Sequence, residues 1–171
     1  AESEVYKKIR QTQCCVDGFA TVAFGLRIRT PVLAKSILGN SKTLREAEAE
    51  ARSVGNAMFQ SYGLLNNRAS NAFMQRVWQS EYKHSIFMVA QIHDAAYVLM
   101  RDNINVVAFA NYHLTREMSW QELPEIQHPD VKLGAELDLF YNGWHQPITL
   151  PNTDNKEELL NIIKDGVKKY S

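Results

Sequence analysis

The sequence contains little of what builds a disulfide scaffold, a fibre or a membrane anchor. Its 171 residues include 2 cysteines, 5 prolines and 8 glycines, a composition that excludes a disulfide scaffold and a collagen-like fibre. The cysteines are adjacent, at Cys14 and Cys15, and no Cys/His cluster has zinc spacing, so we expect reduced thiols in a cytosolic protein. No window reaches the roughly 18 apolar residues of a membrane span, and no basic stretch followed by an apolar run opens the chain. We therefore expect neither secretion nor a membrane partner.

The chain also has no net charge at pH 7. This balance hides a difference in charge between its two halves. Residues 1–80 carry 11 Lys and Arg against 6 Asp and Glu, whereas residues 81–171 carry 8 against 13. A basic half is consistent with a polyanionic partner and equally with an ordinary solvated surface. The 45% hydrophobic content excludes a disordered tail.

The hydrophobic pattern predicts one structural unit of mixed helices and strands, without repeats or linkers. Helices are predicted over residues 2–15 (ended by Gly18), from about 44 to 78 (begun by the capping box Thr43-Leu44-Arg45-Glu46), over 104–118, and from 154 to about 170. Extended segments are predicted over residues 18–25, over 85–100 as two strands, and over 131–140 and 146–150 as a pair turned at Asn142-Gly143.

The long helix predicted from residue 44 has two distinct faces. Its core face consists of Val54, Met58, Leu65, Ala69 and Ala72, with Phe59, Leu64 and Phe73 on the flanks. Nearly opposite runs a polar row of Arg52, Asn56, Gln60, Gly63 and Asn67. On a mostly buried helix such groups suit a fixed polar ligand, because a buried amide without a partner costs about 1 to 3 kcal/mol. Internal hydrogen bonds to neighbouring loops are the alternative interpretation.

One polar pair, His93-Asp94, interrupts the apolar run 85–100. This pattern predicts two buried strands whose tight turn lifts His93 and Asp94 out of the apolar layer. An ionised carboxylate there needs a cation or strong donors nearby, and a turn with a satisfied side chain is the alternative. Earlier in the chain, Arg27 and Arg29 are spaced by two, so in an extended segment both leave the same side.

These segments together resemble the C-terminal part of family A DNA polymerases, the DNA polymerase I type, and especially the versions found in some tailed bacteriophages. The glycine-bounded run 18–25, with Arg27, Arg29 and Pro31 after it, is similar to the segment that follows the family's nucleotide-binding fingers helix.

Two further motifs follow in the family's order. Arg52, Asn56 and Gln60 match, at the same four-residue spacing, an arginine, asparagine and glutamine on a long palm helix. The sequence 91–94, Gln-Ile-His-Asp, matches the family's palm hairpin, where the motif is Gln-Val-His-Asp-Glu. The resemblance covers residues 10 to about 147.

The sequence also departs from the family. Ala95 stands where the family has a glutamate, and the tail from about Pro151 extends beyond many members. The family's first metal aspartate has no counterpart, because Asp17 and Asp138 lack the residues that follow it in the motif. The fingers helix that grips the incoming nucleotide is also missing, so we expect a C-terminal piece that is active only with an N-terminal part.

The resemblance implies an α+β fold, in which the C-terminal palm, an antiparallel sheet with a buried long helix, joins part of the fingers of a polymerase right hand. Residues 1–45 would be the end of the fingers and a connecting segment, 46–151 the palm, and 152–171 a C-terminal helical extension.

The implied activity is template-directed nucleotidyl transfer by a two-metal mechanism in DNA replication, in the cytoplasm of a bacterial or phage-infected cell. The site would hold two Mg²⁺ ions, bound by Asp94 together with a carboxylate from outside this chain. His93 would lie beside Asp94 at the same catalytic site. The expected partners are primer-template DNA, deoxynucleoside triphosphates and the N-terminal portion. The DNA-binding candidates are Arg52, Asn56, Gln60, Arg27 and Arg29.

Three other interpretations remain open. Single-subunit RNA polymerases also carry a His-Asp hairpin in the palm. Incorporation of deoxynucleotides or of ribonucleotides distinguishes the DNA polymerases from these RNA polymerases. The chain is alternatively a non-catalytic DNA-binding or assembly subunit derived from a palm, or a plain α/β domain whose polar row is internally satisfied.

Overall fold

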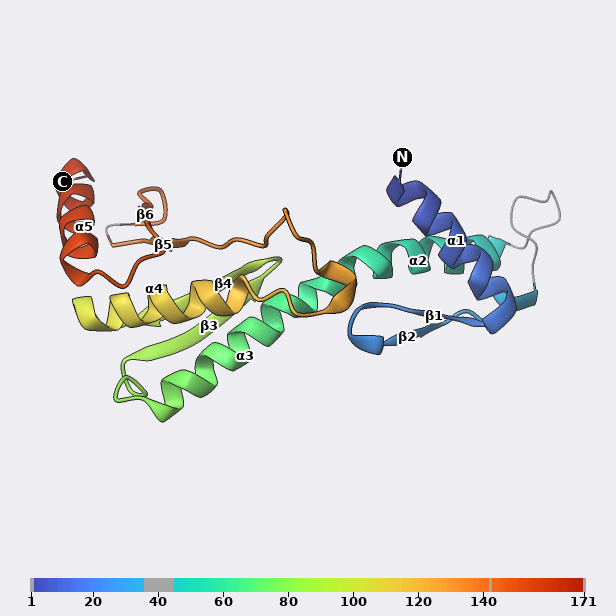
Figure 1. Cartoon of the computed structure of the whole chain (residues 1–171), viewed down its shortest axis with the longest axis horizontal. Helices are drawn as coiled ribbons and strands as arrows, with labels where there is room; N and C mark the ends of the chain where they lie inside the picture. The colour runs from blue at the N-terminus through green and yellow to red at the C-terminus, as the bar shows by residue number, and fades with distance from the viewer. Residues whose placement is uncertain (1, 36–44, 142, 171) are drawn as a thin grey trace. The chain divides into compact units, whose positions relative to one another are not determined.

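The structure, a computed structural model, describes residues 2–35, 45–141 and 143–170 (Figure 1). These residues divide into two compact units, unit 1 (Ala1–Leu64) and unit 2 (Leu65–Ser171), each with its own packing. The sequence predicts a single unit, and the division falls inside its predicted long helix. None of the described helices is long and apolar enough to cross a membrane.

Unit 1 combines two helices with a short antiparallel hairpin. Its elements are α1 (Glu2–Asp17), β1 (Phe19–Thr21), η1 (Ala23–Gly25), β2 (Arg27–Arg29), η2 (Leu33–Lys35), α2 (Arg45–Gln60) and η3 (Ser61–Gly63). Helix α1 ends as predicted, because Gly18 adopts φ 72°, a left-handed conformation that glycine enters without steric cost. The core consists of Cys14, Ala20, Leu33, Ala47, Ala51, Val54 and Met58.

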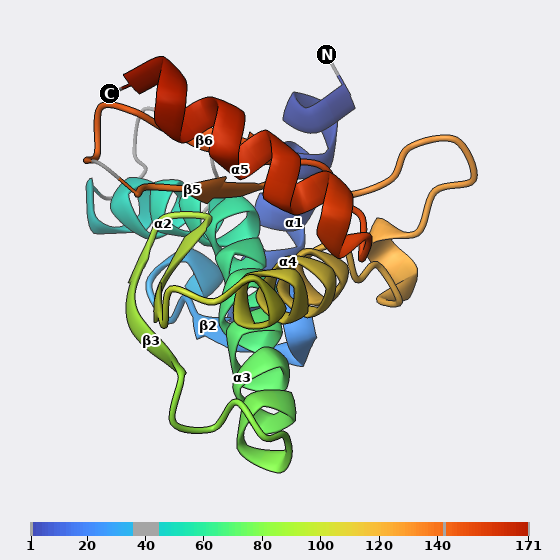
Figure 2. The same ribbon diagram turned by 90° about the vertical axis from the view of Figure 1, so that its left-hand side faces the viewer.

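Unit 2 packs three helices around two small sheets. Its elements are α3 (Leu64–Gln79), β3 (Ile86–Ile92), β4 (Ala95–Met100), α4 (Ile104–Met118), η4 (Pro124–Ile126), β5 (Leu137–Leu139), β6 (Ile148–Leu150) and α5 (Lys156–Tyr170). Helix α5 lies against β6 and α4 (Figure 2). Its Leu159 is fully buried in the same core as Phe73, Ile86, Leu114 and Leu150.

The α+β class is confirmed, as helices and small antiparallel sheets make up the described residues. Those residues form three separate two-stranded sheets, β1–β2, β3–β4 and β5–β6. The polymerase palm and the three predicted segment boundaries stay predictions. Thr43, Leu44 and Asn142, which belong to the predicted capping box and turn, lie outside the described residues.

The predicted long helix is present in two pieces. Helices α2 and α3 are separated by the tighter turn η3, which contains Gly63. A glycine inside a helix costs about 1 kcal/mol relative to alanine. Gly55 nevertheless lies inside α2 without interrupting it, so a glycine alone does not explain the change of helix type at Gly63.

The prediction of two buried strands over residues 85–100 was correct in pairing and wrong in burial. Strands β3 and β4 are antiparallel, with Ile86 opposite Met100 at one end. One face packs on the core, but the other leaves Phe87, Val89 and Leu99 exposed by 49%, 61% and 63%. An apolar run predicts burial on both faces, whereas the described residues cover only one face of this sheet.

Candidate functional site

The hairpin between β3 and β4 turns at His93 and Asp94, as the sequence predicts. Ile92 and Ala95 form the last pair of the ladder, so these two residues alone make the turn. His93 has φ 56°, a left-handed conformation that is uncommon outside glycine but enriched for histidine. Both side chains are exposed, so the turn presents an imidazole and a carboxylate to solvent.

A buried asparagine on α3 supports this turn from behind. Asn66 is only 7% exposed, and its Nδ2 donates to the backbone carbonyl oxygens of His93 at 3.3 Å and of Ala95 at 3.5 Å. These carbonyls flank Asp94, so one side chain fixes the backbone on both sides of the carboxylate. Its Oδ1 has no hydrogen-bond partner within the described residues.

Asn66 was not predicted as a site residue, because only the adjacent Asn67 fits the spacing of the polar row. The signal that distinguishes them is helix phase. Asn66 precedes Ala69 by three residues and Phe73 by seven, and both are fully buried. That spacing puts Asn66 on the core side of α3, while Asn67 is exposed.

The Asp94 carboxylate makes no hydrogen bond or ion pair with any described residue. The alternative in which Asp94 is a turn residue with a satisfied side chain stays open, because the exposed carboxylate is accessible to water. The described residues also hold no group of three or more His, Cys, Asp or Glu side chains that would bind a metal ion. Mg²⁺ is commonly held by one or two carboxylates, with phosphate and water oxygens completing its shell, so Asp94 fits as one ligand among others from outside this chain.

The first three residues of the polar row lie on α2, whereas Gly63 lies in η3 and Asn67 on α3. Arg52, Asn56 and Gln60 are exposed, and none hydrogen-bonds to a described residue. The prediction of a mostly buried helix was wrong here, and the alternative of internal hydrogen bonds has no support within the described residues. Phe59 beside the row is 56% exposed, whereas the predicted flank residue Phe73 lies fully buried in the core of unit 2.

What α2 offers is an open face with regularly spaced donors. Four residues advance a helix by about 6 Å, so Arg52, Asn56 and Gln60 form a line of about 12 Å. The sequence predicts a ligand here because a buried amide without a partner is unstable. These amides are exposed to water, so that reason for a ligand no longer holds. The spacing and the absence of internal partners within the described residues are what remain.

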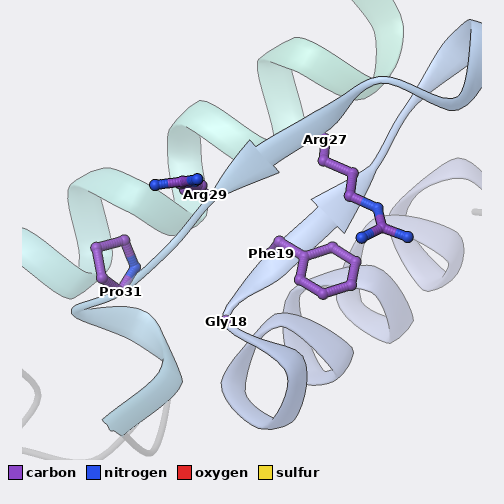
Figure 3. A pocket seen from close by; sticks show the side chains of 5 residues that line it. All are labelled: Gly18, Phe19, Arg27, Arg29 and Pro31. Atoms are coloured by element: carbon purple, nitrogen blue, oxygen red, sulfur yellow. The ribbon is translucent and has the colours of Figure 1, made fainter.

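Arg27 and Arg29 leave the same side of β2, as predicted. Both are exposed, and both border a pocket of about 530 Å³ together with Gly18, Phe19 and Pro31 (Figure 3). The Arg27 guanidinium carbon lies 4.6 Å from the centre of the Phe19 ring. Phe19 was not predicted as a site residue, because its pairing with Arg29 depends on the strand register.

The predicted site residues thus fall into three groups. The arginine pocket and the α2 residues of the polar row belong to unit 1, whereas the hairpin turn belongs to unit 2.

Comparisons with models of protein families, with curated proteins and with solved structures found no match to this chain.

Proposed function

We propose that this chain is the C-terminal part of a DNA-directed DNA polymerase of family A, which carries out template-directed nucleotidyl transfer together with an N-terminal part. The observation that carries the proposal is the sequence Gln91-Ile92-His93-Asp94 at the tip of an antiparallel hairpin, with the Asp94 carboxylate exposed and unpaired within the described residues. The polar row and the arginine pocket support it as additional surfaces for DNA.

The residues have separate roles in this proposal. Divalent ions at such a site activate the primer 3′-hydroxyl and hold the triphosphate when bound. Asp94 supplies one carboxylate ligand at a turn that Asn66 holds in place. Arg52, Asn56 and Gln60 contact the minor-groove acceptors of the last base pairs, which every correct pair presents at similar positions. Such contacts check pair geometry without reading sequence.

The first experiment is primer extension with Mg²⁺ and deoxynucleoside triphosphates. We expect no extension by the 171-residue chain alone, because the first metal aspartate and the triphosphate-binding helix are not in it. We expect extension when the chain is combined with the product of the upstream reading frame or with a co-purifying chain. Extension by the isolated chain, abolished by Asp94→Ala, would overturn the requirement for a second part. Incorporation of ribonucleotides in place of deoxynucleotides would assign the fragment to an RNA polymerase.

A non-catalytic DNA-binding or assembly subunit is the second candidate. Ala95 favours it, because the family motif has a carboxylate at this position. In that case primer-template DNA binds to the combined proteins but no nucleotide is added. Asp94→Asn then leaves DNA binding unchanged.

A further inference from the structure

The pocket beside the β1–β2 hairpin is lined from one face of the strand ladder. Phe19 pairs with Arg29, and residues that face each other across two strands point to the same side. Arg27, two residues earlier on β2, points to that side as well. Gly18 and Pro31 complete the lining of the pocket, whose volume of about 530 Å³ lies within the range of small-ligand sites.

The backbone on either side of this pocket is tied down. The N–H of Thr30 donates to the carbonyl oxygen of Gly18 at 2.8 Å. After Pro31, the N–H groups of Val32 and Leu33 donate to the Glu50 carboxylate at 3.1 and 2.8 Å. Glu50 thus anchors the turn to α2. A pocket with fixed walls loses less conformational entropy on binding than a loose one.

The side chains that line the pocket carry positive charge. Two of its five lining residues are arginines and none is acidic. Neither Arg27 nor Arg29 forms an ion pair within the described part of the chain. Guanidinium groups present paired donors that match the oxygens of a phosphate, so the pocket suits a phosphate-bearing ligand.

The stacked pair in the pocket points to more than a bare anion. The Arg27 side chain extends toward the Phe19 ring, as Figure 3 shows, and the two groups lie 4.6 Å apart. Nucleobases stack on aromatic rings and on guanidinium planes, and single-stranded nucleic acids are bound in this way. A site with a phosphate-binding guanidinium beside such a platform matches the two ends of one nucleotide.

We propose that this pocket holds one nucleotide unit of single-stranded DNA, with its phosphate at Arg29 and its base against the Arg27–Phe19 pair. The choice of DNA as the strand rests on the proposed function, while the preference for a phosphate next to a ring rests on the pocket itself. The pocket admits one splayed nucleotide and is too small for a duplex.

The test measures binding of fluorescein-labelled hexathymidine to the full chain by fluorescence anisotropy, with inorganic phosphate as a competitor. Arg29→Gln should weaken hexathymidine binding about tenfold, as expected for the loss of a charge-assisted contact. Arg27→Gln should weaken it by a similar factor, because it removes the guanidinium plane against which the base stacks. Arg29→Gln should also flatten the log-log salt dependence by about 0.7, the value for one phosphate contact on a single strand. Arg45→Gln removes an exposed arginine of α2 outside the pocket and should change neither quantity.

Phe19→Leu separates the two halves of the proposal. It should weaken hexathymidine binding while leaving competition by inorganic phosphate unchanged, and Phe19→Tyr should restore hexathymidine binding. Equal affinity of the pocket for phosphate and hexathymidine would overturn the assignment to a nucleotide. Arginine variants that bind hexathymidine as Arg45→Gln does would overturn the site altogether.

These outcomes are independent of the test of the proposed function. Binding that depends on Arg27 and Arg29 supports the pocket even if no combination of proteins extends a primer. Primer extension that depends on Asp94, with hexathymidine binding unaffected by either arginine, refutes the pocket and leaves the polymerase assignment in place.

Discussion

Replacing Glu117 by Gln should destabilise unit 2, because this carboxylate joins helices α3 and α4. Glu117 is 9% exposed. Its Oε2 lies 3.0 Å from a terminal nitrogen of Arg68, and its Oε1 accepts from Nε of Arg76 at 2.8 Å. Arg68 also donates to the Glu117 backbone carbonyl oxygen at 3.1 Å and lies 4.0 Å over the Trp120 ring.

The size of the effect follows from the exposure of the two partners. Hydrogen bonds to charged groups contribute about 1.5 to 3 kcal/mol each. The Arg76 side chain is 53% exposed, so its pair falls toward the surface range of about 0.2 to 1 kcal/mol. The Arg68 side chain is 29% exposed and keeps more of its contribution. Because glutamine retains the shape and one acceptor, we expect Glu117→Gln to cost about 2 kcal/mol of unfolding free energy.

Urea unfolding followed by tryptophan fluorescence measures this cost. All three tryptophans of the chain lie in unit 2, so the signal reports on the unit that is perturbed. Glu122→Gln, an exposed change in the following loop, should cost little. Double-mutant cycles should give a larger coupling of Glu117 with Arg68 than with Arg76. A loss equal to that of Glu122→Gln, or the reverse order of couplings, would refute the reasoning.

Three further predictions follow from single contacts. Asn66→Ala should speed hydrogen exchange in the turn 93–95 and cost about 1 kcal/mol of stability, while Asn67→Ala should do neither. Burial, and then the nearby arginines, lower the pKa of His113. The stability that His113 contributes is therefore present above its unfolded pKa of about 6.5 and is lost as the pH falls below that value. His113→Phe should make the melting temperature less dependent on pH between pH 7 and pH 5. Gln60→Ala should leave the melting temperature unchanged, since the side chain is exposed, and weaken extension past a correct pair in the active assembly; a lower melting temperature with normal turnover would assign Gln60 a structural role.

Local signals in the sequence predicted one helix end and one hairpin turn correctly, whereas the strand predicted over residues 131–140 is a strand only at Leu137–Leu139. Gly18 ends α1, and the polar pair His93-Asp94 makes the turn between β3 and β4. In both cases the residues that determine the conformation are adjacent in the chain. Helix α5 likewise begins at Lys156, two residues after the predicted start, and Asn155 Oδ1 accepts from the N–H groups of Glu157 and Glu158 at this end.

Burial and the supporting contacts were not predictable in the same way. Periodicity gives the faces of a helix or strand but not which face is covered, and so Phe87 and the polar row were misjudged. Asn66 meets the turn from 27 residues away, and Glu50 reaches Leu33 from 17 residues away. Such contacts depend on how elements pack, which a single sequence leaves open.

The most direct test of the account is the extension rate of the active assembly carrying Asp94→Asn. This change keeps the shape of the side chain and removes its charge. If Asp94 is a metal ligand, the rate of nucleotide addition should fall at least about a hundredfold, the scale of losing one transition-state-stabilising group, while primer-template DNA still binds. Asp165→Asn, an exposed change on α5, should leave the rate unchanged. Near-normal extension by Asp94→Asn would contradict the account and leave Asp94 as a turn residue.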